Sequence, residues 1–164
     1  MWKIAVTGHR PNKLFGYDLN NPSWIKMGFI FRELILDRIK TYSHVELITG
    51  MALGVDQVFG LVGIKLKKQQ YPVKIHAAIP CLGQEKKWPD KKHWEYIKNN
   101  ADIVKYVSNN SYDKTCMQKR NMYMVDLCDE LFAVCNLTPG GTLNCINYAT
   151  KKNKPILNIY DKIL

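Results

Sequence analysis

The sequence predicts an α/β fold, a three-layer sandwich whose central sheet is mostly parallel. Six short apolar runs alternate along the chain with longer segments in which apolar residues recur at helical spacing. Such an alternation winds into a parallel sheet that helices cover on both faces. The length of 164 residues and the hydrophobic content of 46% fit a single domain over residues 1–164.

Each strand is predicted from a short apolar run that a polar, glycine or proline turn ends. The predicted strands cover residues 2–6, 45–49, 73–80, 103–107, 131–134 and 155–159. The predicted helices cover residues 24–42, 55–70, 90–100, 117–128 and 142–152. Ser23, which follows Pro22, is the predicted N-cap of the first helix, and Tyr71 and Pro72 end the second.

The chain is strongly basic, with 24 Lys and Arg residues against 14 Asp and Glu residues and a net charge of +10. A charge of this size favours anionic partners, which include nucleotides, nucleic acids and acidic proteins. The lysines are spread over many segments, and no aromatic-rich basic nucleic-acid motif is evident. Nucleic-acid binding therefore stays open with weak support.

The N-terminus and the cysteines bear on location and metal binding. Met1 passes directly into a strand without a signal pattern, and no apolar run reaches the roughly 20 residues that span a bilayer. We expect a soluble cytoplasmic protein without membrane contact.

The five cysteines are odd in number and contain no CxxC pair, so neither a disulfide framework nor a zinc site is expected. No cofactor or metal is predicted, and a homo-oligomer stays open.

The segment 130–149 contains the strongest candidate for an anion site. A buried strand is followed by a turn with the sequence NLTPGGT and then by a helix. Gly140, Gly141 and Thr142 at such a turn allow backbone N–H groups to approach a phosphate, and the helix N-terminus adds unpaired donors and partial positive charge. The alternative is that the glycines only turn the chain, with Thr142 as an ordinary N-cap.

Polar residues also follow the first predicted strand. Thr7, Gly8, His9 and Arg10 form a glycine-bearing turn in which Arg10 is suited to pair with a phosphate. His9 is suited to donate to a phosphate or to act as an acid or base near neutral pH. The alternative is a surface arginine beside a loop histidine. Tyr17, in the loop that follows, either covers a base or fills a small satellite core.

A third glycine turn joins the second strand to its helix. Gly50 and Gly54 have the spacing of a backbone cradle, but the Lys-Ser/Thr of a P-loop and the GxGxxG fingerprint are both absent. Asp56 lies just inside the helix N-terminus, where it either stabilises the helix dipole or binds a ribose hydroxyl. Lys86 and Trp88 follow the third strand. All these turns follow strands, so we expect them to meet at the carboxyl edge of the sheet.

Four segments, taken in order, resemble a known family. The sequences TGHRP at 7–11, ITGMALGVD at 48–56, QEKKW at 84–88 and TPGGT at 138–142 are similar to the YpsA-like branch of the SLOG superfamily. This superfamily includes the DNA-processing protein Smf and the Lonely-guy phosphoribohydrolases. The resemblance covers nearly the whole chain and implies a Rossmann-like fold whose glycine turns bind a nucleotide or a nucleotide-derived ligand.

The resemblance also implies two catalytic positions. In the hydrolase relatives, an Arg in MxxRK and a Glu in PGGxGTxxE serve cleavage of an N-glycosidic bond. Here Arg120 matches the Arg, whereas the second motif is shortened and Cys145 stands where that Glu is expected. Glycosidic cleavage needs a carboxylate, and a thiol at its ordinary pKa is a poor substitute. Asp56 is the best-placed replacement, so Asp56 and Arg120 are the candidate catalytic residues.

Three functions therefore stay open. The first, which the missing Glu favours, is binding of a nucleotide-like small molecule for sensing or sequestration, with phosphate at Gly140–Thr142 and Arg10, ribose at Asp56, and a base against Trp88 or Tyr17. The second is a nucleoside-monophosphate N-glycosidase, and the third is DNA binding by analogy with Smf. The expected ligand-binding residues are Thr7, Gly8, His9, Arg10, Tyr17, Gly50, Gly54, Asp56, Lys86, Trp88, Arg120, Gly140, Gly141 and Thr142.

Overall fold

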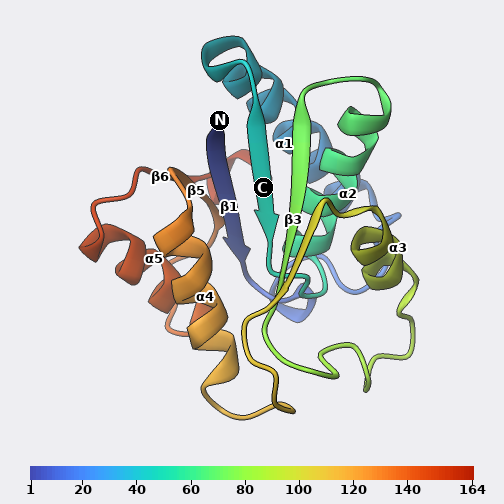
Figure 1. Cartoon of the computed structure of the whole chain (residues 1–164), viewed down its shortest axis with the longest axis vertical. Helices are drawn as coiled ribbons and strands as arrows, with labels where there is room; N and C mark the ends of the chain where they lie inside the picture. Colours follow the sequence, from blue (N-terminus) through green and yellow to red (C-terminus); the bar gives the residue numbers. More distant parts are fainter.

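The computed structural model describes all 164 residues as alternating strands and helices (Figure 1). The strands are β1 (Trp2–Gly8), β2 (Val45–Thr49), β3 (Val73–Ile79), β4 (Ile103–Tyr106), β5 (Glu130–Val134) and β6 (Ile156–Asn158). The helices are α1 (Pro22–Tyr42), α2 (Val55–Lys68), α3 (Lys92–Asn100), α4 (Cys116–Leu127) and α5 (Gly141–Lys151). Two short 3-10 turns, η1 (Pro11–Lys13) and η2 (Tyr160–Lys162), complete the elements.

All six strands are parallel and form one sheet in the order β4-β3-β2-β1-β5-β6. From β1 the chain builds outward through β2, β3 and β4, and it then returns to the other side of β1 to form β5 and β6. The direction of winding therefore reverses between β1 and β5. In open α/β sheets, ligands bind beyond the carboxyl ends of the strands at such a reversal.

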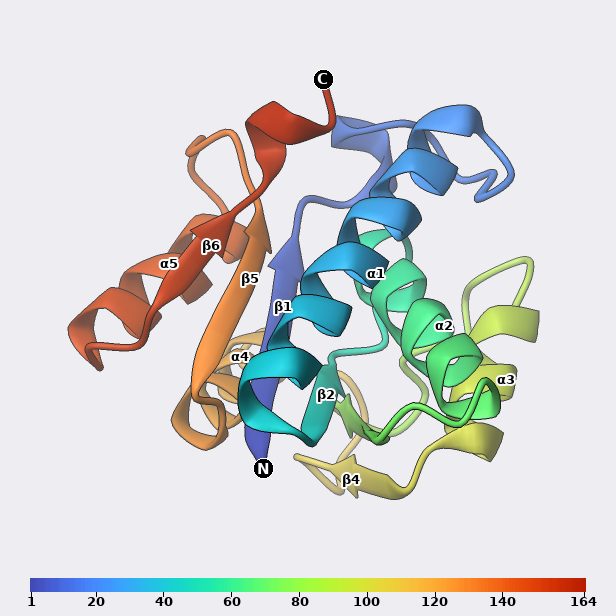
Figure 2. The same ribbon diagram turned by 90° about the horizontal axis from the view of Figure 1, so that it is seen from above.

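The sheet lies between two helical layers (Figures 1 and 2). Helices α1, α2 and α3 cover one face over a core that contains Ile4 and Val6, and α4 and α5 cover the other face over a core that contains Ala5 and Ile48. Consecutive residues of β1 thus enter opposite cores, because side chains alternate along a strand. The predicted α/β, Rossmann-like three-layer sandwich is confirmed, and its sheet is entirely parallel.

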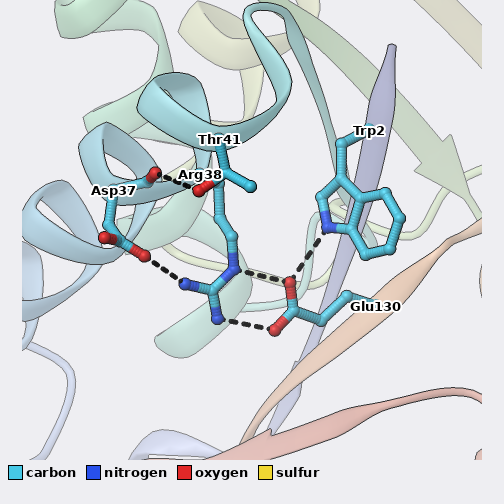
Figure 3. A network of polar contacts seen from close by, with 5 residues as sticks. All are labelled: Trp2, Asp37, Arg38, Thr41 and Glu130. Carbon is cyan, nitrogen blue, oxygen red and sulfur yellow. Dashed lines mark hydrogen bonds and ion pairs between the residues drawn. The ribbon is translucent and has the colours of Figure 1, made fainter.

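A polar network ties α1 to the amino ends of β1 and β5 (Figure 3). The Arg38 guanidinium donates to both carboxylate oxygens of Glu130, from Nε at 2.8 Å and from Nη2 at 2.7 Å. Trp2 Nε1 donates to Glu130 Oε2 at 3.0 Å, and Arg38 Nη1 donates to Asp37 at 2.7 Å. Because Glu130 is 6% exposed, this two-point pairing satisfies a nearly buried carboxylate at the end of the sheet far from the glycine turns.

One local prediction is corrected, and one short element was not predicted. The N-cap of α1 is Asn21, whose side chain accepts a hydrogen bond from the Ser23 N–H at 2.9 Å, and Pro22 is the first helical residue. Sequence reasoning placed the cap at Ser23 because it treated Pro22 as a residue outside the helix. The turn η1 was not expected, since three residues carry too little periodicity to be recognised.

Candidate functional site

A cavity of about 280 Å³ lies at the reversal point, beyond the carboxyl ends of β1 and β5. We call it the α5 cavity. Its walls come from the end of β1, from η1, from the β2–α2 turn, from α4 and from the first residues of α5. They consist of Val6, Thr7, Gly8, His9, Arg10, Asn12, Lys13, Ala52, Asp56, Met117, Arg120, Asn121, Gly140, Gly141 and Thr142.

The N-terminus of α5 forms one wall. Gly140 is the N-cap with φ of 150°, a conformation that favours glycine, and no side chain caps the helix. The first hydrogen bond of the helix runs from the Asn144 N–H to the Gly140 carbonyl, so the N–H groups of Gly141, Thr142 and Leu143 have no acceptor in the protein. Thr142 is therefore not the N-cap. Uncapped N–H groups with the positive end of the helix dipole are suited to bind an anion.

His9 and Asn136 fix the turn that leads to α5. Thr138 donates from its N–H and its hydroxyl to Asn136 Oδ1, at 3.1 and 2.6 Å, which identifies Oδ1 as the acceptor. His9 Nε2 contacts the same residue twice, since it lies 2.7 Å from Asn136 Oδ1 and accepts the backbone N–H of Asn136 at 3.1 Å. His9 is only 4% exposed, and its own N–H donates to the Val134 carbonyl. Its ring nitrogen Nε2 is thus engaged in holding the turn.

Two cations at the rim of the α5 cavity have no partner in the protein. Arg10 and Lys13 are exposed, and neither forms a side-chain hydrogen bond or an ion pair. The turn η1 brings Lys13 Nζ to within 3.9 Å of the point where a Cβ on Gly140 would stand. An arginine and a lysine beside an uncapped helix N-terminus form a positively charged recess.

Gly50 does not line the α5 cavity, but it packs against Arg120 and Asp56, which do. Its carbonyl accepts hydrogen bonds from Arg120 Nη1 and, at 3.1 Å, from Gln84 Nε2. A Cβ at this position would stand 2.6 Å from Arg120 Cζ and 2.7 Å from Asp56 Oδ2. Gly50 therefore permits close packing of the two charged side chains against the backbone. Gln84, in turn, accepts from Trp94 Nε1 at 3.0 Å, which ties this layer to α3.

Arg120 projects from α4 and is 5% exposed. Besides the bond to Gly50, its Nε donates to Asn121 Oδ1 at 3.0 Å, and Nη2 has only the weakly accepting Met117 Sδ at 4.0 Å. Burial lowers the pKa of Arg120 below its ordinary 12.5, and the Asp56 carboxylate opposes this shift. The guanidinium remains protonated at neutral pH, and its Nη2 is the group available to a ligand.

Asp56 is a nearly buried carboxyl group, 6% exposed, in the first turn of α2. Its Oδ2 accepts the Ala52 N–H at 3.2 Å, and Thr49 Oγ1 donates to its backbone carbonyl at 2.7 Å. Burial raises the pKa of Asp56 above 3.8, although the charge of Arg120, the Ala52 N–H and the charge of Arg10 act against the rise. No ion pair within 4.0 Å joins Asp56 to Arg120.

Cys145 lies inside the core between α5 and the sheet and is fully buried. Burial raises the pKa of its thiol to about 12, although a hydrogen bond with Thr7 and the charge of Arg120 oppose the rise. The thiolate is therefore negligible at neutral pH, and the thiol does not line the cavity. The position at which the resemblance expects a glutamate holds no group that can activate water.

Two further cavities adjoin the α5 cavity, and Arg10 lines all three. The Tyr17 cavity, of about 480 Å³, is lined by Arg10, Pro11, Tyr17, Leu19, Leu53, Gly54, Gln57, Trp88, Pro89, Asp90 and His93. The Tyr112 cavity, of about 580 Å³, is lined by Arg10, Ala52, Leu82, Gly83, Gln84, Lys86, Lys87, Trp88, Ser111, Tyr112 and Met117. The segment after β3, which runs at the lower end of the molecule in Figure 1, contributes Trp88 to both cavities.

The expected residues thus fall into three groups. Thr7, Gly8, His9, Arg10, Asp56, Arg120, Gly140, Gly141 and Thr142 line the α5 cavity, whereas Tyr17, Gly54, Lys86 and Trp88 line the adjoining ones. Gly50 lies beneath the site. The expected set did not include Val6, Asn12, Lys13, Ala52, Met117 and Asn121. No motif pointed to Asn12 or Lys13. Met117 and Asn121 belong to the segment that matches MxxRK, and Met117 lies one helical turn before Arg120, so both could have been included.

The side chains form no cluster suited to a metal ion, since no three His, Cys, Asp or Glu residues lie close enough together to hold one. All five cysteines are free and buried. None of the helices combines the length and the apolar character that crossing a membrane requires.

Fold and site together define a class, the Rossmann-like proteins with a charged cavity at the point where the sheet reverses. Within this class, the chain belongs to the YpsA family, whose model, described as the YspA SLOG family, matches residues 4–160. The resemblance to the YpsA-like branch of the SLOG superfamily is confirmed.

Relatives and solved structures agree with this assignment. The chain is 34% identical over 146 residues to the SPbeta prophage-derived protein YoqJ of Bacillus subtilis, a match that covers 81% of this chain and 85% of YoqJ. It is 25% identical to the UPF0398 protein LBA1157 of Lactobacillus acidophilus, over 86% of this chain and 76% of that protein.

Among solved structures, the fold is similar to that of DNA processing protein A (DprA). The TM-score is 0.65 for the protein from Streptococcus pneumoniae at 17% identity, and 0.61 for the protein from Helicobacter pylori at 18% identity. Each match covers 94% of this chain, which spans only 49% and 63% of the respective DprA chains. At these identities the likeness shows the fold alone.

Proposed function

We propose that this protein, as a single domain, binds a nucleotide or a nucleotide-derived small molecule whose phosphate lies at the N-terminus of α5. One observation carries the proposal: the uncapped N–H groups of α5 border the same cavity as the unpaired cations Arg10 and Lys13. Helix N-termini and arginine side chains both bind phosphate through N–H donors, and together they supply several converging donors and positive charge.

The remaining contacts follow from the neighbouring residues. Asp56 is suited to accept a hydrogen bond from a ribose hydroxyl, since it lines the α5 cavity and has no arginine within ion-pair distance. A base attached to that ribose reaches the adjoining surface beside Arg10, where Tyr17 and Trp88 offer aromatic faces. Arg120 Nη2 donates a hydrogen bond to the phosphate or to the ribose.

Binding without turnover is the function that the site supports best. N-glycosidic cleavage breaks the bond between base and ribose while water adds to the ribose carbon, and it requires a carboxylate to steady the cationic centre or to activate the water. Cys145, with its buried thiol and a pKa of about 12, provides no such group. The position of the relatives' glutamate therefore supplies no catalytic carboxylate, which favours a ligand that is held and not consumed.

A nucleoside-monophosphate N-glycosidase is the second candidate, and one observation favours it. Asp56 is a buried carboxyl group with a raised pKa that faces the same cavity as Arg120, and such groups are typical of acid–base catalysts. In this alternative Arg120 anchors the phosphate and Asp56 carries the chemistry.

Nucleic-acid binding is the third candidate. The DprA protein of Helicobacter pylori binds single-stranded DNA, and the present chain shares its fold and carries a net charge of +10. A strand held mainly by diffuse charge loses affinity steeply as salt rises. A small ligand held by a few fixed donors shows a much weaker salt dependence.

Two measurements on the intact protein test the proposal. Mass spectrometry of small molecules released on denaturation identifies a ligand that was retained through purification. Titration with a panel of nucleoside monophosphates then measures affinity, and chromatography of the same mixtures detects any free base. Saturable binding without release of free base supports the proposal, whereas failure of every phosphorylated ligand to bind would overturn it.

A further inference from the structure

The Tyr112 cavity is a recess with both apolar and basic side chains in its wall, and the proposed mononucleotide contacts leave it unused. Leu82 is 49% exposed and Tyr112 is 65% exposed, and both line this recess of about 580 Å³. Large apolar side chains that gather in an exposed hollow commonly mark a binding surface. Lys86 and Lys87 lie in the same wall, so the recess also suits an anionic ligand.

Backbone hydrogen bonds give this recess a defined shape. The Leu82 N–H donates to the Asn110 carbonyl at 3.0 Å, and Leu82 pairs with Ser111 in a parallel bridge. The Ser108 N–H donates to the Pro80 carbonyl at 3.1 Å. The segments that follow β3 and β4 are therefore joined side by side, and they extend the pairing of these two strands beyond the sheet.

Trp88 separates the Tyr112 cavity from the Tyr17 cavity. It lines both, its N–H donates to the Glu85 carbonyl at 3.0 Å, and its ring packs against the core under α1 and α2. Arg10 lines these two cavities and the α5 cavity as well. A phosphate bound beside Arg10 thus has an aromatic recess on either side of Trp88.

We propose that the ligand is a dinucleotide, two nucleosides joined through phosphate, with one base in the Tyr17 cavity and the other in the Tyr112 cavity. This rests on the proposed function, because it takes the phosphate of the ligand to lie in the α5 cavity. The two recesses, of about 480 and 580 Å³, are similar in size. Each lies within the usual range for a small-molecule site. A mononucleotide fills only one of them.

The test compares mononucleotides with dinucleotides. Titration calorimetry measures the affinity of the four ribonucleoside 5′-monophosphates and of the matching dinucleoside diphosphates, in which pyrophosphate joins the two 5′ positions. We expect the preferred dinucleotide to bind at least about 10-fold more tightly than its monophosphate. Tyr17→Ala and Tyr112→Ala should each weaken dinucleotide binding about 5- to 150-fold, the range typical of lost base stacking.

The monophosphate provides the internal control. Only one of the two substitutions should weaken binding of the monophosphate, since its single base occupies one recess. Tyr71 lies between α2 and β3, and Tyr71→Ala should change the affinity for neither ligand. Monophosphate binding that the dinucleotide does not exceed would overturn the second base site and leave the proposed function standing. Binding of neither class would overturn both. Tighter binding of a ten-nucleotide single strand than of any dinucleotide would also overturn the proposal, since the two recesses would then hold part of a nucleic acid.

Discussion

The Arg120 guanidinium donates a hydrogen bond to the carbonyl oxygen of Gly50, which joins α4 to the turn after β2 directly beneath the α5 cavity. The contact exists because Gly50 has no side chain, since a Cβ would stand 2.6 Å from Arg120 Cζ. It places a charged side chain of α4 against the backbone just after the carboxyl end of β2. The geometry of the site therefore depends on packing at this glycine.

Gly50→Ala should destabilise the protein through overpacking, by about 1–3 kcal/mol, because both Arg120 and Asp56 must move. Gly141→Ala is the matched control, since nothing lies within 4 Å of the position of its Cβ. Urea denaturation should show a loss for the first substitution and a change within about 0.5 kcal/mol for the second. Equal losses would mean that the crowding at Gly50 relaxes without cost.

Gly141→Ala should nevertheless weaken binding of a phosphorylated ligand. The added methyl group points into open space beside the N–H groups of α5, where the phosphate is proposed to lie. A protein that folds normally and binds less tightly separates this effect from instability. An unchanged affinity for the ligand would place the phosphate elsewhere.

Arg10→Ala should weaken binding of a phosphorylated ligand by about 1.5–3 kcal/mol, as expected for loss of a charge-assisted hydrogen bond. Lys151, on the exposed end of α5, is the control of equal charge, and Lys151→Ala should have almost no effect. Calorimetric titration compares the two. Similar losses for both, together with a steep salt dependence, would indicate that diffuse charge drives binding, as in nucleic-acid recognition.

Glu130→Gln should remove a pH-dependent part of the stability. Burial alone raises the pKa of Glu130, but the hydrogen bonds from Arg38 and Trp2 and the charge of Arg38 outweigh it, so the pKa lies below the ordinary 4.5. A carboxyl group with a lowered pKa stabilises the fold above its unfolded pKa and loses that contribution as the pH falls through its folded pKa. Loss of these charge-assisted bonds should cost about 1.5–3 kcal/mol at pH 7.

Denaturation of wild type and Glu130→Gln across pH measures this contribution. Their difference in unfolding free energy should be constant from pH 7 to about pH 5 and should shrink as the pH falls below about 4.5. Glu33→Gln is a suitable control, because Glu33 forms no ion pair and no side-chain hydrogen bond. A difference that does not depend on pH would contradict the role given to the Glu130 charge.

The fold could be predicted from the sequence because its six strands are short apolar runs with turns between them. The reversal of the sheet between β1 and β5 could not, since local patterns do not determine strand order. Gly140 and Gly141 were placed at the site because glycine turns after strands meet at one edge. Gly50 has the same signature but faces inward, and only the packing of Arg120 and Asp56 distinguishes the two cases. Lys13 enters the site through η1, a turn too short for its periodicity to be recognised.

Asp56→Asn distinguishes a binder from a hydrolase, because the amide keeps the shape of the side chain and removes its charge. In a binder the substitution should change affinity alone. In a hydrolase it should leave affinity within a small factor and abolish release of free base, since the carboxylate would carry the chemistry. Parallel titration and chromatography of the variant report both quantities.

Release of free base by the wild-type protein tests the central claim most directly. The protein is incubated with each nucleoside monophosphate that binds, and free base is quantified against the protein concentration over many hours. Cys145, which occupies the position of the relatives' catalytic glutamate, is buried and has a raised pKa. We therefore expect saturable binding of the nucleotide and no release of base above the rate without protein. Sustained release of many equivalents per protein would contradict the account, and it would make Asp56 and Arg120 catalytic residues of an N-glycosidase.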